Sequence, residues 1–566
     1  MRELLHATLS AVQAAARCLR GVTSLTLPDE FGKARRLSPL SDRSSRLLAV
    51  VRLTSIVALI LLTLDSAAAR AADPFIFTQV PVRTGRASAR AHADVSLAWD
   101  LSVGSRIVAF DPSTSSNSVT ALTSDFSAAG RPDPSFDGKR ILFVGKHNVN
   151  DPFQIWEMNV DGGDVRRITD GPGSVREAVY LSTLYTLDAD APFYRIAFDS
   201  DACGMPGGCL YTCRLDGTDV RQITFDPNGA SDPYLLSDSR LLFSRWSGAE
   251  AAGSSQTGAG GTALLTVHVD GTDVFPFAAM HEPPAIRSMP CETPDGWVIY
   301  VESPVGSPDR GGSLVAVARS RSLHTRRVLA SDPDGLYYSP FPMGDGNLLV
   351  SYRTTSGGSY GIYTFNRSTG TRAARVFDDP RWHDIDAVVV QPRRVPAGRS
   401  SVVDERLDHG FLYCMNAYIS DRDEGKAISP GQIKRLQVVR AGSGGAQNPT
   451  TVEAQAQGGP GRPGIGEELL GEVPVEADGS FFLKVPARTP LRLQIIGPNG
   501  EVLQAMRSYI WVMPRENRGC IGCHEDRELT PPNRHVQALR NAPHAVGIDA
   551  ERSRRLDREY EKSGSR

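Results

Sequence analysis

Apolar and polar positions repeat along residues 95–395 of the 566-residue chain. Three segments pair an Asp-Gly turn with an alternating, β-prone run, and they begin at Asp161, Asp216 and Asp270, 55 and 54 residues apart. Weaker copies extend the series in both directions, as VTALTS (119–124), TRRVLA (325–330) and AARVFD (373–378). Alternation over so short a stretch is typical of a strand with one buried face.

A second kind of segment lies between these copies, a continuous apolar run of about five residues that is typical of a strand buried on both faces. The six runs are RIVAF (106–110), RILFV (140–144), YRIAF (194–198), RLLFS (240–244), WVIYV (297–301) and NLLVSY (347–352). A repeat of ~40–50 residues with several strands per unit indicates a propeller, because each small sheet needs neighbours in a ring to bury its faces. We therefore expect an all-β protein with a six-bladed β-propeller over residues 73–400. A row of β-sandwiches is the alternative, which the regular spacing disfavours.

The repeat stops after Pro396, and a different strand pattern follows. Strands are expected at residues 411–419, 433–439, 469–475, 480–485, 491–496, 502–506 and 509–512, with a Gly-rich loop at 441–466. Asp478-Gly479 and Asn499-Gly500 are strong hairpin signals. We expect a small β-sandwich domain over 405–515, then a segment poor in strand signals at 516–548. The charged tail 549–566 is expected to be a frayed helix or disordered.

The N-terminus has the order of a secretory signal peptide. Arg43, Arg46 and Arg52 lead into the apolar run 53–64, and Ala69-Arg70-Ala71 supplies a small-residue cleavage site. The run is short for a membrane span. We expect residues 1–71 to be a signal peptide with a long N-terminal extension, and the protein to be periplasmic or otherwise exported. An uncleaved membrane anchor is the alternative.

The balance of acidic and basic residues bears on whether the protein binds nucleic acid. Lys and Arg number 62 and Asp and Glu 64, for a formal net charge of −2. A nucleic-acid binder would show a basic surplus, so we expect no nucleic-acid partner. We also expect no integral membrane span once the signal is removed.

The chemistry lies in the sequence Cys520-Ile521-Gly522-Cys523-His524, which matches C-x-x-C-H, the attachment motif of c-type haem. Cys520 and Cys523 would add to the two haem vinyl groups, and His524 would be the proximal ligand to the iron. Gly519 and Gly522 would let the backbone approach the porphyrin. The alternatives are a thioredoxin-like redox pair, a disulfide or half a zinc site. The redox pair lacks a βαβ pattern, and the zinc site lacks a second ligand pair nearby. We therefore expect one covalent haem c.

The sixth iron ligand is open. The candidates are Glu528, four residues after His524, together with His535, His544, Met506 and Met513. A methionine ligand would raise the reduction potential relative to a second histidine. An open position would instead favour chemistry on a small ligand.

The stretch 478–533, behind six propeller units, resembles the hydrazine synthase alpha-subunit family. The repeats themselves resemble the TolB-type, WD40-like propeller repeat in DPSFDGKRILF (133–143) and DGTDVRQIT (216–224). The family resemblance implies a propeller and a c-type haem held by Cys520, Cys523 and His524. It also implies that Glu528 occupies the position of a tyrosine that contacts the iron in the synthase.

The remaining cysteines and one hydrolase-like motif are expected to be structural. Cys203, Cys209 and Cys213 lie close together in a Gly-rich region, where an oxidising compartment permits a disulfide between an unassigned pair. Cys291 and Cys414 are expected to be buried and inert. Gly357-Gly-Ser-Tyr-Gly361 matches G-x-S-x-G, but it runs into a predicted strand, whereas a nucleophile elbow leads into a helix.

Three functions follow. The first is a mono-haem c-type redox protein that passes electrons to a redox partner protein, with the propeller and sandwich shielding the haem. The second is an oxidoreductase of the hydrazine synthase type, whose haem iron binds a small nitrogenous substrate. The third is a propeller that binds proteins and carries no functional haem. The catalytic residues, the substrate and the oligomeric state are not defined by the sequence.

Overall fold

A computed structural model describes the chain from residue 74 to residue 564, with gaps. The described residues are 74–82, 101–113, 118–205, 207–247, 261–279, 282–307, 309–331, 333, 335–419, 428–442, 466–506, 508–522 and 535–564. In the separate unit Met1–Ala72, two short strands are described, β1 (Thr26–Leu27) and β2 (Arg35–Arg36), which pair with each other. The predicted signal peptide otherwise lies outside the described residues.

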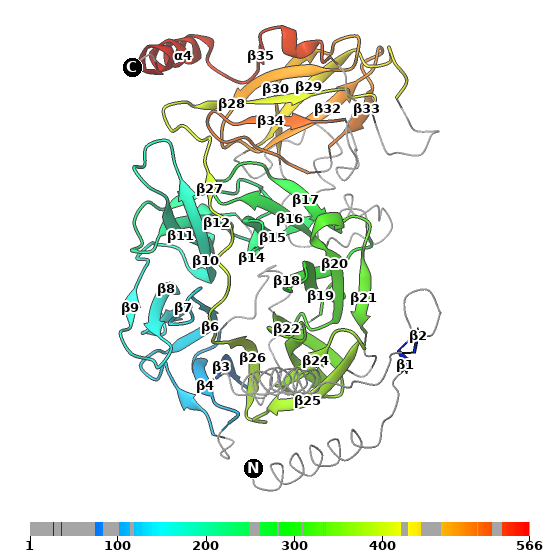
Figure 1. Ribbon diagram of the computed structural model, residues 1–566. Helices are drawn as coiled ribbons and strands as arrows, with labels where there is room; N and C mark the ends of the chain where they lie inside the picture. Colours follow the sequence, from blue (N-terminus) through cyan, green and yellow to red (C-terminus); the bar gives the residue numbers. More distant parts are fainter. Residues whose placement is uncertain are drawn as a thin grey trace. The chain divides into compact units, whose positions relative to one another are not determined.

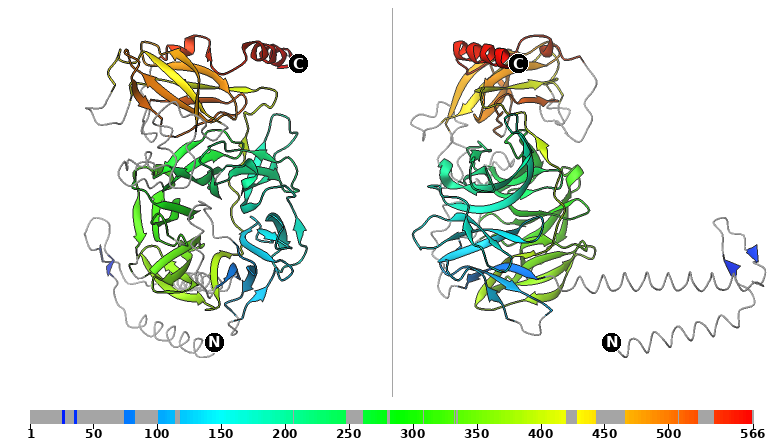
Figure 2. Two further views of the ribbon diagram at one scale, coloured as in Figure 1. Left: turned by 180° about the vertical axis from the view of Figure 1, so that it is seen from behind. Right: turned by 60° about the vertical axis from the view of Figure 1, so that its left-hand side comes forward.

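The predicted β-propeller is confirmed. The described residues of unit Asp73–Arg566 include six antiparallel sheets of four strands each, one of which gains a fifth strand. The strand nearest the axis in each sheet touches the equivalent strand of the next sheet, so the six sheets close into a ring (Figures 1 and 2).

From the axis outward, the six blades have the following strands. The first three are β6 (Ala128–Pro134), β7 (Arg140–Lys146), β8 (Gln154–Asn159) and β9 (Arg166–Arg167); β10 (Val175–Tyr185), β11 (Phe193–Ser200), β12 (Cys209–Arg214) and β13 (Arg221–Gln222); and β14 (Ser231–Leu235), β15 (Arg240–Ser247), β16 (Gly261–His268) and β17 (Phe275–Ala278). The others are β18 (Ile286–Glu292), β19 (Trp297–Ser303), β20 (Ser313–Ala318) and β21 (Arg327–Ala330); β22 (Gly335–Pro342), β23 (Leu348–Thr354), β24 (Gly357–Asn366) and β25 (Thr371–Phe377); and β26 (Trp382–Val389), β3 (Phe75–Pro81), β4 (Arg106–Phe110) and β5 (Thr120–Ala121).

The repeated Asp-Gly pairs form the turn before the outermost strand of three blades. The Asp carboxylate accepts the backbone N–H two residues on, for example Thr218 N to Asp216 Oδ1 at 3.0 Å. The glycine then takes a left-handed conformation, with φ of 83° at Gly217 and 87° at Gly271. A side chain there would be strained, which explains why glycine recurs at this step of the repeat.

All six apolar runs form strands, but one of them takes a different place in its blade. The run RIVAF (106–110) forms β4, the third strand of its blade, whereas the other five apolar runs form second strands. The cause is ring closure: β26, from the end of the propeller sequence, pairs with β3, from its start, and supplies the innermost strand of the blade that contains RIVAF. Residues 75–81 therefore hold the second-strand position. The G-x-S-x-G motif lies at the start of β24, as a strand of a hairpin.

The predicted β-sandwich follows the propeller. One sheet has the order β34 (Asn517–Cys520), β28 (His409–Cys414), β31 (Phe481–Pro486) and β35 (His544–Ala545). The other has the order β30 (Glu467–Pro474), β29 (Arg435–Ala441), β32 (Leu491–Ile496) and β33 (Val502–Ala505). Their facing side chains, among them Leu436, Leu483 and Leu491, form one buried core. The segment 516–548, expected to be poor in strands, supplies both edge strands β34 and β35.

The charged tail forms a helix, α4 (Ala550–Gly564), where the sequence left a frayed helix or disorder open. The carboxylate of Asp557 in this helix forms a 2.6 Å ion pair with Lys484. The same carboxylate lies 3.3 Å from Nε2 of His409, a residue that is 1% exposed. These contacts hold the helix on the sandwich. Among the described residues, no helix is long and apolar enough to cross a membrane.

The cysteine cluster forms one disulfide, between Cys203 and Cys209. It closes the loop between β11 and β12. Cys213 is a buried free thiol in β12, and burial raises its pKa to about 12. Burial raises the pKa of Cys291 as well, so both thiols are poor nucleophiles.

Candidate functional site

Cys520 ends the edge strand β34, which pairs in parallel with β28. The segment is fixed along its length by backbone hydrogen bonds from Phe411 N to Glu516 O (2.7 Å), Met415 N to Cys520 O (2.9 Å) and Asn416 N to Ile521 O (3.1 Å). Cys520 is half-buried and packs against the edge of the sandwich core. The first cysteine of the motif is therefore held on a rigid strand at the border of the domain. Cys523, His524 and Glu528 lie outside the described residues.

Gly519 and Gly522 lie close to other parts of the protein. A Cβ on Gly519 would overlap the ring of Tyr413. A Cβ on Gly522 would lie 2.5 Å from the carbonyl oxygen of Ile419. Both glycines thus allow the motif to pack against the protein's own backbone and side chains.

A third cysteine lies beside the motif. Cys414 of β28 is the direct register partner of Cys520, so the two side chains lie on the same face of the sheet. Cys414 is 1% exposed, as expected from the sequence, and belongs to the sandwich core. The sequence showed both cysteines but not that strand pairing brings them together.

Of the candidates for the sixth ligand, His535 is the one that the described structure places at the same end of the sheet as Cys520. Cys414 pairs with both Cys520 and Phe481, so the turn before β31 lies at that end. The segment after His535 is held at this turn, with Gln537 N donating to Asp478 (2.9 Å) and Ala538 N donating to Ser480 (3.0 Å). His535 is exposed two residues before this anchor.

The other described candidates lie less favourably. His544 is exposed on β35, the opposite edge strand, three strand spacings or about 14 Å from β34. Met513 is 3% exposed and packs into a propeller core cluster. Met506 is half-buried against the sandwich core, where Cys520 also packs.

The cysteine-bearing strand is attached to the propeller through the turn between β16 and β17. The indole of Trp511 donates to Gly271 O at 2.9 Å. The guanidinium of Arg518 donates to Val274 O and lies 4.4 Å from the ring centre of Phe275. These side chains connect β34 to one blade without an intervening flexible loop.

Glu516 is buried at this junction with 4% exposure. Its carboxylate accepts two backbone N–H groups, from Asp273 at 2.8 Å and from Met513 at 2.6 Å. Burial raises its pKa to about 7, although Arg518 and the two N–H donors act in the opposite direction. A carboxyl group that titrates near neutral pH therefore lies four residues before Cys520. Sequence reasoning missed it, because only the fold buries it.

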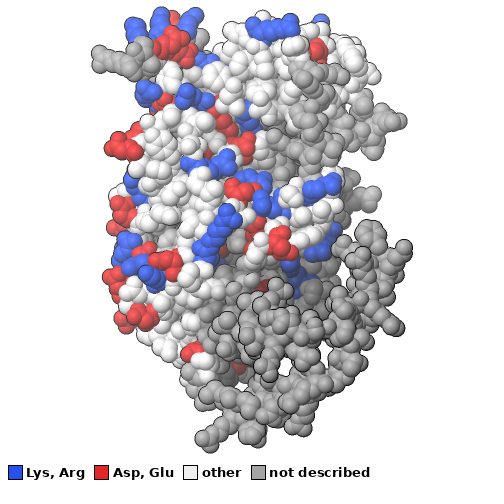
Figure 3. Space-filling view, viewed as in Figure 1, with Lys and Arg blue, Asp and Glu red and all other residues white. Residues whose placement is uncertain are grey.

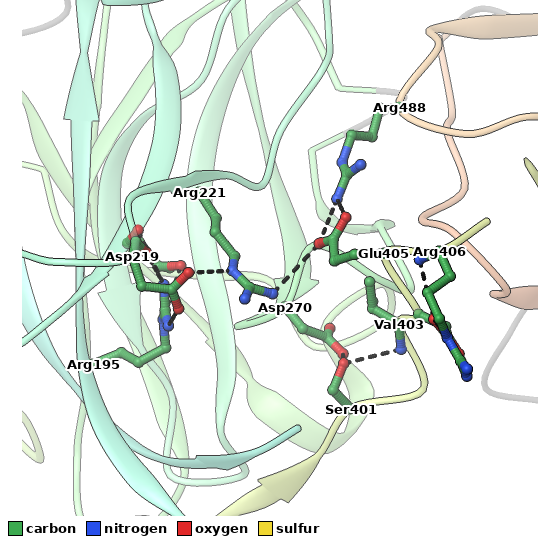
Figure 4. A network of polar contacts seen from close by, with 11 residues as sticks. Arg195, Asp219, Arg221, Asp270, Ser401, Val403, Glu405, Arg406 and Arg488 are labelled. Carbon is green, nitrogen blue, oxygen red and sulfur yellow. Dashed lines mark hydrogen bonds and ion pairs between the residues drawn. The ribbon is translucent and has the colours of Figure 1, made fainter. Parts of the chain in front are cut away.

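A second set of contacts joins the propeller, the sandwich and the linker between them, which runs from the end of β26 to the start of β28 (Figure 4). Arg221 of β13 lies 2.7 Å from Asp219 and 3.4 Å from Glu405, and Arg488 of the sandwich lies 2.5 Å from Glu405. A small pocket opens here, lined in part by Arg195, Asp270, Ser401 and Met513. Each labelled charge in Figure 4 is paired within the protein, so these contacts hold the domains together.

The surface charge is mixed. On the described part of the face in Figure 3, basic and acidic side chains alternate over the propeller. This distribution agrees with the net charge of −2.

Cys520 is the described residue of the predicted haem site. A thioether needs a thiol that a porphyrin edge can reach, and half-buried Cys520 at a strand end meets that need, whereas Cys213, Cys291 and Cys414 are buried. Among the described residues, no three His, Cys, Asp or Glu side chains converge as a metal site. Cys520 thus fits a haem c, and Cys520, Cys523 and His524 are the residues that would hold it.

The fold and the placement of Cys520 define a class: six-bladed propeller proteins with a C-terminal β-sandwich in which the first cysteine of a C-x-x-C-H sequence ends an edge strand. Residues 431–525 match the family model of the hydrazine synthase alpha subunit middle domain. The chain is therefore similar to the hydrazine synthase alpha subunit.

Two comparisons define the relationship. The chain is 28% identical over 539 residues to the hydrazine synthase subunit alpha of Kuenenia stuttgartiensis, covering 77% of this chain and 65% of that protein. It matches the solved structure of Kuenenia stuttgartiensis hydrazine synthase with a TM-score of 0.70 and 26% identity, over 83% of this chain and 71% of that one. TolB from Acinetobacter baumannii matches with a TM-score of 0.33 and 11% identity. The match covers 65% of the curated relative, so the chain spans less than two thirds of that protein's length.

Proposed function

We propose that the protein is an exported redox protein of the hydrazine synthase alpha type, carrying one covalent haem c on Cys520 and Cys523. The observation that carries the proposal is the position of Cys520, half-buried at the end of a hydrogen-bonded edge strand and followed by Cys523 and His524. Thioether attachment takes place outside the cytoplasm, which agrees with the predicted signal peptide.

The haem would supply a one-electron carrier at the border of the sandwich. The protein's own residues would set its surroundings. β34 and β28 fix the position of Cys520, and Trp511 and Arg518 fix that strand against the propeller. His535 is the residue that we propose for the sixth ligand position, because its segment returns to the same end of the sheet.

A redox partner protein would dock near this end of the sandwich. The curated relative is named as a subunit, which supports an assembly for this chain too. The mixed charge on the described part of the face in Figure 3 favours a partner bound there by several local contacts over one attracted by a large single-signed field.

The second candidate is a haem enzyme that acts on a small nitrogenous substrate. It rests on the similarity to hydrazine synthase, together with Glu528, which would replace the family's iron-contacting tyrosine. Coordination separates the two candidates. A six-coordinate low-spin iron favours electron transfer, and a five-coordinate high-spin iron that binds CO favours catalysis.

The experiment is a pyridine haemochrome spectrum of the full chain, expressed with the c-type maturation machinery and in parallel without it. We expect a thioether-type spectrum that is lost in Cys523→Ala and retained in Cys291→Ala, a buried propeller cysteine that serves as the matched control. A folded, matured protein without covalent haem would overturn the proposal and leave a protein-binding propeller as the function.

A further inference from the structure

The inner strands of the six blades surround the axis of the propeller (Figures 1 and 2). Five of them carry the same irregularity, a β-bulge whose first extra residue has a positive φ. These residues are Arg131 (58°), Asp232 (52°), Met289 (54°), Ser339 (38°) and Asp386 (53°). Non-glycine residues rarely adopt this conformation, which is unfavourable and accumulates at ligand sites. A bulge also re-aims side chains, here within the strands that line the axis.

Charged side chains gather where these bulges lie. Arg131, Glu177, Asp232 and Asp386 come from inner strands, Asp199 from β11, Arg176 from the start of β10, and Arg310 from the loop between β19 and β20. They act on one another electrostatically, and Tyr338 lies among them. We call these eight residues the axial cluster. It holds four carboxyl groups against three guanidinium groups, so it carries one excess negative charge when fully ionised.

Asp232 and Arg310 of the axial cluster lie near each other but form no hydrogen bond with each other. Arg310 Nη1 lies 4.0 Å from Asp232 Oδ1, which is too long for a hydrogen bond. Asp232 Oδ2 and Arg310 Nη2 have no hydrogen-bond partner among the described residues, although the two residues are only 5% and 8% exposed. Nε and Nη2 of Arg176 are also buried without a hydrogen-bond partner there. Buried polar atoms are nearly always paired, so one acceptor and three donors left open point to a polar guest.

Glu177 shows how the excess charge is balanced without a guest. Burial, followed by the charge of Asp232, raises its pKa well above its ordinary value, against the effect of Arg131. A proton on Glu177 makes the axial cluster neutral. A bound cation would do the same and would release that proton.

We propose that the axial cluster binds a small protonated amine, whose N–H groups donate to Asp232 and whose positive charge offsets the excess negative charge of the cluster. An amine fits better than a metal ion because no three carboxyl or imidazole groups of the described residues converge at metal-binding distance. An anion would add to the excess negative charge. This site is independent of haem.

The linker limits access to one side of the ring. Arg393 lies 3.2 Å from Asp133 and donates to Pro134 O, and Ala397 O accepts Ser182 Oγ at 3.3 Å. These contacts place residues 393–397 across the turns that join first to second strands. Arg310 lies on a turn between second and third strands, and in an antiparallel sheet successive turns lie at opposite ends. An amine would therefore enter past Arg310.

The test compares methylammonium with tetramethylammonium, which has the same charge but no N–H donor, at equal ionic strength on the full chain. We expect methylammonium alone to raise the Tm. We also expect calorimetry in two buffers of different ionisation enthalpy to show that binding releases a proton. Equal Tm values in the two salts would overturn the proposal and leave Glu177 as a protonated structural residue.

Variants locate the site. Asp232→Asn removes the open acceptor and the excess charge, and should weaken methylammonium binding by about tenfold or more, as expected for a lost charge-assisted hydrogen bond. Asp384→Asn is the matched control, a buried carboxyl group on β26 that hydrogen-bonds to Gln79 instead. If Asp232→Asn does not fold, Glu177→Gln should bind amine without proton release. Undiminished binding in Asp232→Asn, or proton release in Glu177→Gln, would contradict the site.

Discussion

The indole nitrogen of Trp511 donates a 2.9 Å hydrogen bond to the carbonyl oxygen of Gly271, and this bond joins the sandwich to one propeller blade. Trp511 is 1% exposed, and its ring belongs to the same apolar cluster as Val269 and Val274. Gly271 has a φ of 87° and is the second residue of an Asp-Gly turn. A turn of the repeat therefore also serves as the docking point for the domain that carries the C-x-x-C-H motif.

Replacing Trp511 should loosen this junction. Trp511→Phe leaves the Gly271 carbonyl without its donor and should lower the free energy of unfolding by about 1–3 kcal/mol. Trp511→Ala should lower it by about 3–5 kcal/mol, because it also leaves a cavity. Urea unfolding followed by circular dichroism measures both. An unchanged midpoint in both variants would contradict a packed junction.

Glu516 should make stability depend on pH. Its pKa is about 7 in the folded protein and 4.5 as a free side chain, so the folded protein binds more protons between these values. Its contribution is therefore complete below pH 4.5 and is lost as the pH rises to 7, by up to about 3 kcal/mol.

Glu516→Gln isolates this contribution. Because the variant cannot ionise, the difference in unfolding free energy between wild type and variant should change between pH 4.5 and pH 7 and stay constant above it. Urea midpoints across this range measure the difference. A difference that does not vary with pH would show that Glu516 stays ionised when buried.

The register of β28 and β34 predicts cross-linking when haem is absent. Cys414 and Cys520 are direct partners, at a backbone spacing that a disulfide can bridge. In protein produced without haem maturation, oxidised glutathione should oxidise the two thiols to a disulfide and be reduced to two glutathione thiols. Non-reducing peptide mapping detects this disulfide. Matured protein should show no such link, because Cys520 would be held in a thioether. Cys520 that remains open to alkylation after oxidation would contradict the register.

His535 should control the spin state of the proposed haem. His535→Ala should convert a six-coordinate low-spin spectrum to a five-coordinate high-spin one. His544→Ala is the control, because β35 places it at the far edge of the sheet. The absorption spectrum and electron paramagnetic resonance of the matured protein distinguish these outcomes. A low-spin spectrum that survives in His535→Ala but not in His544→Ala would reverse the assignment.

Local patterns predicted most of the fold. The Asp-Gly turns and apolar runs identified six blades, because each feature reflects the geometry of a few adjacent residues. The different place of RIVAF in its blade was not predictable, because ring closure pairs β26 with β3 across about 300 residues, which no local pattern records. At two of the bulges, Arg131 and Asp232, the next residue is a proline that the sequence shows. A following proline does not by itself indicate a positive φ.

Of the proposed site, the sequence alone indicates only the residues that would attach the haem. The spacing of Cys520, Cys523 and His524 is a sequence signal in itself. The raised pKa of Glu516, the pairing of Cys414 with Cys520 and the return of His535 all depend on contacts between distant segments. The strand β34 was missed because its residues, Asn-Arg-Gly-Cys, have weak strand preference and are held by pairing with β28.

The central claim is that Cys520 and Cys523 carry one haem, and the most direct test is intact-mass spectrometry of the matured protein with peptide mapping. The account predicts a mass increase of a single haem that survives denaturation and maps to the peptide containing both cysteines. A matured, folded protein whose mass equals that of the polypeptide alone would contradict it.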